Sequence, residues 1–252
     1  MPVPKKSSAS SKVYFDRWAL GWGKTWAYRL FKGHHTQLNS LYWSHASALR
    51  FVFSATRGRR REDPANSLLS LPANDLTRIN ISLGDWAKCY GDFDNWVRLN
   101  CLVAITGYLE VYLKTVTRLA LESDPCIAVS VKHGIDGVTA LKRKPRYSFA
   151  EEVLPCVRGT WGERLAHYAR LFGHVPSLLN SSIRDLERLR IIRNGVTHSF
   201  GRATDDYDRL LDTKPKPYQK VKADRLKSTL ALVDKIALAV DNHLGKEHIG
   251  DY

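Results

Sequence analysis

The chain has 252 residues, of which 44% are hydrophobic, so it can bury the core of one large domain or of a domain with a smaller appendage. This composition argues against disorder over most of the length. The formal charge of +14 favours a polyanionic partner, most simply nucleic acid. The alternatives that charge alone leaves open are an acidic membrane surface and a basic protein that binds no polyanion.

The N-terminal stretch is polar and lacks the apolar run of a secretory signal, and we expect residues 1–12 to be disordered. No segment approaches the ~18 uninterrupted apolar residues of a membrane-spanning helix. The four cysteines are scattered, with no pair at metal-ligand or redox-motif spacing, which indicates reduced and mostly buried thiols. We therefore expect a cytoplasmic protein without a membrane partner.

Aromatic residues are concentrated near the start of the chain. Trp18, Trp22 and Trp26 recur every four residues, which places them on one helical face. Such a stripe is typical of a core or a subunit interface, and stacking on nucleic-acid bases is the alternative. Apolar helical spacing continues over 39–56, and a charged, proline-containing stretch at 57–75 predicts a surface connection. We therefore expect a helical N-terminal extension (13–75) before a main helical domain (76–252).

Four further segments carry helical signals. The three-four spacing of apolar residues is clearest over 95–122, from Leu102 to Leu119. Residues 126–155 are irregular and basic, which fits a loop or a short hairpin. Asn180, Ser181 and Ser182 offer capping side chains for a later helix. The remaining helices are expected over 160–173, 179–194 and 221–245. Long helices joined by loops predict an all-α bundle.

The most informative feature is the segment from Arg193 to His198. Metal-independent cleavage of RNA needs a base for the 2′-hydroxyl, an acid for the 5′-oxygen and positive charge for the phosphorane. Histidine titrates near neutral pH and can serve as either base or acid, and Arg193 offers forked donors to phosphate oxygens. Asn194 could orient either group. The ribose supplies the nucleophile, so we expect neither a metal ion nor a cofactor.

Helical geometry poses a difficulty for this pair. Positions five apart on a regular helix diverge by ~140° around the axis and ~7.5 Å along it. Gly195 could bend or end the helix between Arg193 and His198. A two-fold dimer is the other solution, because two copies of the segment would then face each other across one groove.

The same residues carry a family resemblance. Arg193-Asn194 and His198 match the Arg-polar-x-x-x-His motif of HEPN domains (higher eukaryote and prokaryote nucleotide-binding domains). The helix around residues 108–113 and the run from Thr160 to Gly173 resemble those of HEPN proteins in bacterial toxins and antiviral systems, including those named for similarity to ribonuclease L. The resemblance covers about residues 80–245.

The resemblance implies a four- or five-helix bundle, a homodimer with a composite site, and metal-independent endoribonuclease activity on RNA, with tRNA as one candidate. Cleavage would leave a 2′,3′-cyclic phosphate and a 5′-hydroxyl. It implies catalytic roles for Arg193, His198 and Asn194, and Glu110 is a further accessory candidate. A bacterial toxin or antiphage effector held by an antitoxin or companion protein would fit this class. The alternative is a non-catalytic HEPN module that binds nucleotide, RNA or a protein partner.

Other basic and imidazole side chains complete the set of candidates. Basic side chains usually lie in solvated loops or on the solvent-exposed face of a helix, so we expect only some of these basic residues to contact RNA. We expect Arg184, Arg188 and Arg193 to share one polar face of their helix. The four histidines His34, His35, His243 and His248 are expected to face solvent without binding metal. The full set of RNA-contact candidates is Arg184, Arg188, Arg190, Lys142, Arg143 and Lys144. A DNA-binding helical regulator is a weaker alternative, because no helix-turn-helix pattern is visible.

Overall fold

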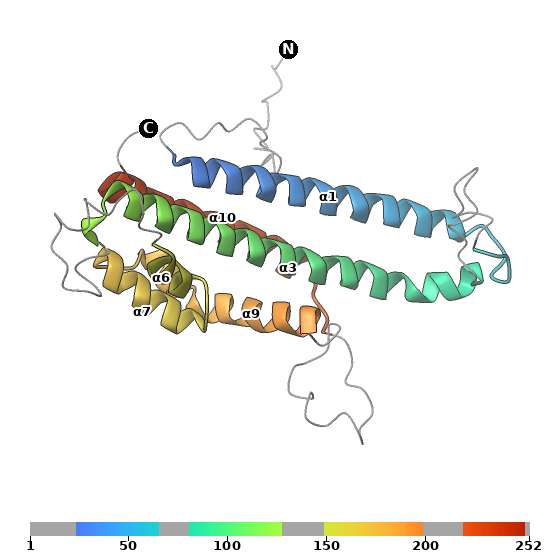
Figure 1. The fold of residues 1–252 in the computed structure, drawn as a ribbon. Helices are drawn as coiled ribbons and strands as arrows, with labels where there is room; N and C mark the ends of the chain where they lie inside the picture. The colour runs from blue at the N-terminus through green and yellow to red at the C-terminus, as the bar shows by residue number, and fades with distance from the viewer. Residues whose placement is uncertain (1–23, 66–80, 128–148, 199–218, 250–252) are drawn as a thin grey trace, which may run out of the picture.

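The computed structural model describes residues 24–65, 81–127, 149–198 and 219–249, and every regular element in these ranges is helical (Figure 1). Within the described ranges the chain forms no strand, only an isolated bridge between Pro64 and Ser82. The expected all-α class is therefore confirmed. None of the described helices is long and apolar enough to cross a membrane.

Three long helices form the frame of the molecule: α1 (Trp26–Thr56), α3 (Leu83–Ser123) and α10 (Ala223–Leu244). Figure 1 shows α1 and α3 side by side along the whole length of the molecule, with α10 behind them. α3 is central because it packs against α1, α10 and α9 (Ile183–His198). One hydrophobic core joins these helices, with buried side chains that include Phe31, Leu102, Ile105, Leu109, Val116, Leu186, Val233 and Ala237.

The start of α3 differs from the prediction, because the helix begins at Leu83 rather than near residue 95. The hydroxyl of Ser82 accepts a hydrogen bond from the Asp85 amide at 3.1 Å and caps the first turn. Leu83 and Trp86 then bury against Ala65 in a second, smaller cluster away from the main core. The first turns of α3 therefore lack the three-four spacing of apolar residues that predicts a helix over 95–122.

A buried carboxylate fastens the beginning of α1 to α10. Asp241 accepts hydrogen bonds from the Thr25 backbone amide, at 3.2 Å, and from the Thr25 hydroxyl. The Tyr112 hydroxyl lies 3.3 Å from the same carboxylate. A negative charge at this position satisfies free N–H groups at the start of α1 and complements its dipole. Further along the same two helices, Nζ of Lys32 and Oδ2 of Asp234 form an ion pair at 2.6 Å.

Shorter helices cover the other side of α3. They are α6 (Ala150–Val153), the 3-10 turn η2 (Leu154–Cys156), α7 (Trp161–Phe172) and α8 (Ser177–Ser181), which precedes α9. A capping box starts α7, because the Thr160 hydroxyl accepts from the Glu163 amide while the Glu163 carboxylate accepts from the Thr160 amide. The π-helical turn η4 (Gly245–Ile249) continues the chain beyond α10.

The predicted helix over 179–194 is divided and displaced in the structure. α8 ends at Ser181, and α9 runs from Ile183 to His198. The hydroxyl groups of Ser181 and Ser182 both donate to the carbonyl of Leu178, at 3.1 and 2.7 Å. These hydroxyls therefore close α8, and the expected cap on α9 is not seen among the described contacts. The last predicted helix is confirmed: its apolar face, from Leu226 to Leu244, is buried.

Some expectations fall outside the described residues, namely those for 1–12, Trp18, Trp22 and most of the 126–155 segment. Trp26 is 57% exposed, so a core position for it is wrong. All four cysteines are free thiols. Burial raises the pKa of Cys101 to about 11 and that of Cys156 to about 12, so these two thiols are unreactive at neutral pH.

Candidate functional site

Arg193 lies on the side of α9 that faces α3. Its Nη2 atom is 3.5 Å from Oε2 of Glu110, a carboxylate in the C-terminal half of α3. The Arg193 side chain keeps 36% of its surface exposed, whereas Glu110 keeps only 14%. The structure therefore brings together the predicted arginine and the predicted accessory carboxylate, with the arginine at the edge of the helix packing.

A second arginine holds Glu110 from the opposite side. Arg164 of α7 is 4% exposed, and its Nη1 atom lies 3.0 Å from Oε1 of Glu110. Its Nε–H donates to the Gly159 carbonyl at 3.3 Å, and its guanidinium lies over the Trp161 ring at 4.7 Å. No local pattern singles out Arg164 from the other arginines, because its charged partner, Glu110, lies 54 residues earlier in the chain.

Gly159 gives this arrangement its backbone geometry. Its φ is +79°, a left-handed conformation that other residues rarely adopt, and a Cβ would meet the Glu163 carboxylate at 2.4 Å. The turn at Gly159 leads directly into the capping box of α7 and points its carbonyl at Arg164. The position of Arg164, and through it that of Glu110, thus depends on a glycine five residues earlier.

The three side chains Arg164, Glu110 and Arg193, here called the Glu110 network, carry one net positive charge. The buried guanidinium of Arg164 already contacts Glu110, Gly159 and the Trp161 ring. Arg193 makes a longer contact to Glu110 and has other N–H donors, which its exposure leaves accessible to an anion. The network can therefore hold Arg193 in place while that side chain still binds a phosphate oxygen.

His198 is exposed at the last position of α9, and Asn194 is half-buried. The helix is continuous through Gly195, so the expected bend or break at this glycine is wrong. The Thr197 hydroxyl donates to the Arg193 carbonyl at 2.9 Å within the same regular turn. Because the helix stays regular, Arg193 and His198 point in directions ~140° apart. One chain does not bring this pair together.

The basic residues on α9 do not form one face. Arg184 and Arg188 are exposed and only about 40° apart around the axis, so they share one face as expected, but Arg193 lies about 180° from Arg184, so its expected place on that face is wrong. Arg190 donates from Nε to Glu187 at 2.7 Å, and this bond holds the pKa of the Glu187 carboxyl below its usual range. Lys142, Arg143 and Lys144 lie outside the described residues.

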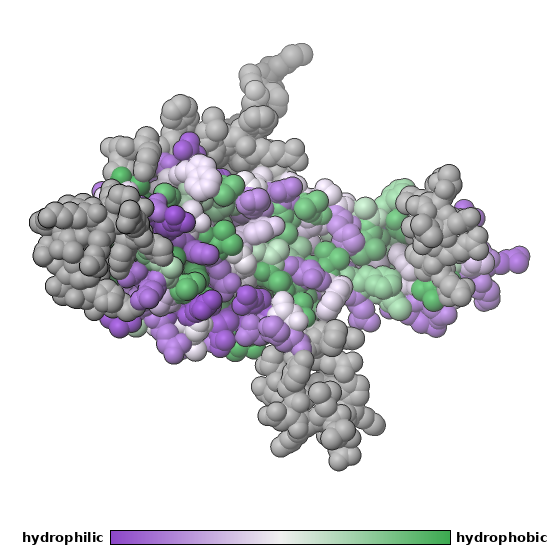
Figure 2. All heavy atoms as spheres, viewed as in Figure 1, coloured by the Kyte–Doolittle hydropathy of each residue, from purple (hydrophilic) through white to green (hydrophobic). Residues whose placement is uncertain are grey.

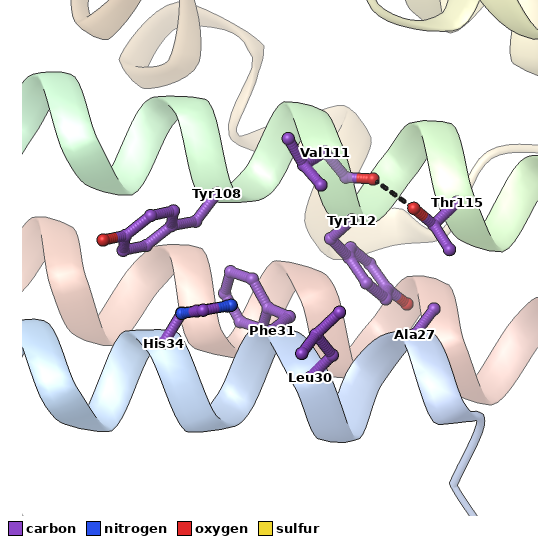
Figure 3. Close-up of a pocket in the computed structure, with 8 residues that line it drawn as sticks. All are labelled: Ala27, Leu30, Phe31, His34, Tyr108, Val111, Tyr112 and Thr115. Carbon is purple, nitrogen blue, oxygen red and sulfur yellow. Dashed lines mark hydrogen bonds between the residues drawn. The ribbon is translucent and has the colours of Figure 1, made fainter.

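Figure 2 shows hydrophilic residues along the edge of the molecule where α7 and α9 lie. A separate groove of about 220 Å³ lies between α1 and α3 (Figure 3). Leu30, Phe31 and Val111 line it together with the His34 and Tyr108 rings, whose centroids are 5.3 Å apart. Its mostly apolar lining offers no arrangement of donors for a phosphate.

Two of the four histidines expected to face solvent are buried. His35 donates from Nε2 to the Leu230 carbonyl at 2.9 Å, and His243 contacts the Tyr168 hydroxyl through Nδ1 at 2.8 Å. Among the described residues, one group could hold a metal ion: His174, His243 and Glu247, whose ligand atoms all lie within 4.8 Å of one another. Sequence reasoning missed this group because His174 is distant in the chain.

Comparisons of the chain with protein-family models, with curated proteins and with solved structures find no match. The features of the chain that bear on its function are therefore its own geometry and the short motif at the end of α9.

Proposed function

We propose that the protein is a metal-independent endoribonuclease of the HEPN type, acting as a homodimer on RNA. The observation that supports this most is the end of α9, where Arg193 is anchored by Glu110 yet remains one-third exposed and His198 is exposed one turn later. A guanidinium and an imidazole at the surface of one helix end supply the charge and the proton transfer that RNA cleavage needs.

In the proposed reaction, His198 removes the proton from the ribose 2′-hydroxyl or protonates the departing 5′-oxygen. The 2′-oxygen attacks the adjacent phosphorus, the bond to the 5′-oxygen breaks, and a 2′,3′-cyclic phosphate and a 5′-hydroxyl result. Arg193 stabilises the phosphorane, because its remaining N–H donors reach the non-bridging oxygens. Asn194 orients the phosphate or the imidazole.

The divergence of Arg193 and His198 supports a composite site. In a two-fold dimer, Arg193 of one protomer would meet His198 of the other, so the dimer would hold two sites, each built from one Arg193 and one His198. Each protomer would thus contribute half of each site. The contact of Arg193 with the largely buried Glu110 carboxylate would hold the arginine in place before the partner binds.

The charge of +14 supports RNA as the substrate, because a polyanion would be drawn to the protein over a long range. We further propose that the enzyme acts as a bacterial toxin or antiphage effector, with tRNA as a candidate target, and that an antitoxin or companion protein restrains it. The surface of α9 around His198 is where such an inhibitor would bind most effectively.

The test is incubation of tag-free protein with total RNA in the presence of a chelator, followed by analysis of the cleaved ends. We expect 2′,3′-cyclic phosphate ends, and a loss of about 100-fold or more in rate for His198→Ala and for Arg193→Ala. His34→Ala, which changes an exposed histidine of α1, and Arg118→Ala, which changes an exposed arginine of α3, are the matched controls. Unchanged cleavage by His198→Ala would overturn the proposal.

A non-catalytic HEPN module is the second candidate, and the divergence of Arg193 and His198 within one chain also fits it. In that case the basic surface would bind RNA or nucleotide without cleaving it. RNA binding without cyclic-phosphate ends at any protein concentration, including concentrations at which a dimer is demonstrated, would favour this alternative.

A further inference from the structure

Three metal-ligating side chains meet at the end of the bundle where α10 finishes. His243 lies in the last turn of α10, Glu247 in η4, and His174 in the connection between α7 and α8. Their ligand atoms lie within 4.8 Å of one another, and Nε2 of His243 is 3.3 Å from Oε2 of Glu247. The His174 and His243 rings are 4.1 Å apart between centroids.

The backbone brings these residues together from two parts of the chain. His243 and Glu247 are four residues apart, which places them one above the other on a helical face. His174 arrives from α7, which ends at Gly173 with a φ of +77°. That left-handed residue turns the chain immediately before His174. The cluster therefore joins the ends of α7 and α10.

Polar atoms in this region are buried without hydrogen bonds. Nε2 of His243, in a side chain that is only 5% exposed, lies 3.3 Å from Oε2 of Glu247, and this contact lacks the geometry of a well-formed hydrogen bond. Nε2 of His248, whose ring centroid lies 6.0 Å from that of His243, is also buried and lacks a described partner. Buried polar nitrogens normally form good hydrogen bonds, so Nε2 of His243 has only the Glu247 carboxylate to offset its burial among the described residues.

The other nitrogen of His243 already has the contact that a metal-ligating histidine needs. Its Nδ1 lies 2.8 Å from the Tyr168 hydroxyl. If Nδ1–H donates to that oxygen, Nε2 carries the lone pair and points toward Glu247. A second contact of this kind fixes the tautomer and the orientation of the ring in most metal-bound histidines. Both Tyr168 and His243 are buried, so the orientation is held by packing as well.

We propose that His174, His243 and Glu247 bind one Zn²⁺ ion, with solvent as the fourth ligand. Two imidazoles and a carboxylate suit zinc and exclude Mg²⁺ and Ca²⁺, which prefer oxygen ligands. Tetrahedral ligands at ~2.1 Å from zinc are ~3.4 Å apart, a separation that His243 and Glu247 already have and that His174 reaches by a small side-chain movement. His174 and Glu247 are exposed, so water can occupy the fourth position.

The bound ion would fasten η4 and the end of α10 to the end of α7. This role is structural and is separate from the proposed chemistry at α9, since none of the three ligands belongs to the Glu110 network. The competing interpretation is a plain ion pair between a protonated His243 and Glu247. An ion pair would need no contribution from His174, so a loss of zinc binding in a His174 variant distinguishes the two interpretations.

The test uses tag-free full-length protein treated with a chelator, dialysed, and titrated with ZnCl₂ by calorimetry. We expect one ion bound per chain and a rise in melting temperature that grows with free zinc. Glu247→Gln and His174→Ala should each weaken zinc binding by about tenfold or more, because each removes one ligand. Both side chains are exposed, so the variants should fold, and circular dichroism checks this.

Glu62→Gln and His34→Ala are the matched controls, since Glu62 follows α1 at the other end of the bundle and His34 lies on α1, both side chains are exposed, and both variants should bind zinc like the unmodified protein. Co²⁺ provides a second measurement, because tetrahedral coordination gives intense visible absorption that His174→Ala should abolish. Absence of one bound ion per chain, or equal affinity in the two ligand variants and the controls, would overturn the proposal. RNA cleavage is not a readout, so this test is independent of the proposed enzyme activity.

Discussion

The carboxylate of Glu110 holds Arg193 at 3.5 Å, and the same carboxylate holds the buried Arg164 at 3.0 Å. The two contacts are unequal, because Arg164 is 4% exposed and Arg193 is 36% exposed. Glu110 is therefore first of all the counter-charge of a buried guanidinium. Its effect on Arg193 is to position an arginine that still has donors to offer, so we regard Glu110 as a positioning residue.

This arrangement makes Glu110 important for stability. Glu110→Gln leaves Arg164 buried without a counter-charge, and the free energy of unfolding should fall by about 3 kcal/mol. Glu122→Gln is the matched control, because Glu122 pairs with Arg118 on the exposed face of the same helix; it should change stability by less than about 0.5 kcal/mol. Urea denaturation measures both. Equal effects would show that the Glu110 network does not stabilise the fold.

Several features of the fold are readable from the sequence because they depend on neighbours along the chain. The apolar face of α10 and the three-four spacing of apolar residues over 95–122 are of this kind. The start of α3 was not readable, because Leu83 and Trp86 pack in a small cluster of their own. Partners that come together only in three dimensions, such as Arg164 with Glu110, leave no local signal.

The candidate site at the end of α9 was also only partly predictable from the sequence. The motif Arg193-Asn194 and His198 was visible as a pattern, but its geometry depended on whether Gly195 would interrupt the helix. A glycine inside a helix costs only about 1 kcal/mol relative to alanine, and the surrounding packing of α9 outweighs that cost. The helix therefore continues, and the separation of the two side chains follows from its regularity.

The exposed arginines of α9 should dominate its contribution to RNA binding. Arg184→Ala together with Arg188→Ala should weaken RNA binding and reduce the slope of log affinity against log salt by about one per arginine. Arg190→Ala should change the slope less, because that guanidinium already pairs with Glu187 at 2.5 Å. Fluorescence anisotropy across a salt series measures this. An unchanged slope in the double variant would place the RNA surface elsewhere.

His35 should make folding sensitive to acid. Burial lowers its pKa, and the neutral ring is fixed by Nε2–H donating to the Leu230 carbonyl while Nδ1 faces the Asn39 amide at 3.4 Å. The hydrogen bond to Leu230 and the nearby Asp234 oppose that lowering of the pKa, and Lys32 adds to it. The unfolded chain takes up the proton first, so this stability is present above about pH 6.5 and is lost as pH falls toward the folded-state pKa.

His35→Gln keeps a donor for Leu230 and removes the titration. The free energy of unfolding of the unmodified protein should therefore fall more steeply below about pH 6.5 than that of the variant, by up to about 1.4 kcal/mol per pH unit. The pKa of His243 is also lowered, mainly by burial, but that group is present in both proteins and cancels in the comparison. If the free energy of unfolding of the two proteins changed in parallel with pH, the pKa of His35 would be the same in the folded and unfolded chain.

The composite site makes a prediction that no single-chain site shares. Arg193→Ala and His198→Ala should each be inactive alone, because every site in either homodimer lacks one group. When the two variants are mixed in equal amounts and their subunits exchange, about half of the dimers contain one chain of each variant. Each of these mixed dimers has one complete site and one site that lacks both groups. About a quarter of the unmodified activity should therefore return. Mixing His198→Ala with an Arg193→Ala, His198→Ala double variant is the control, which should stay inactive. If Arg193 and His198 worked within one chain, the first mixture would also remain inactive, and the rate of RNA cleavage separates the two cases.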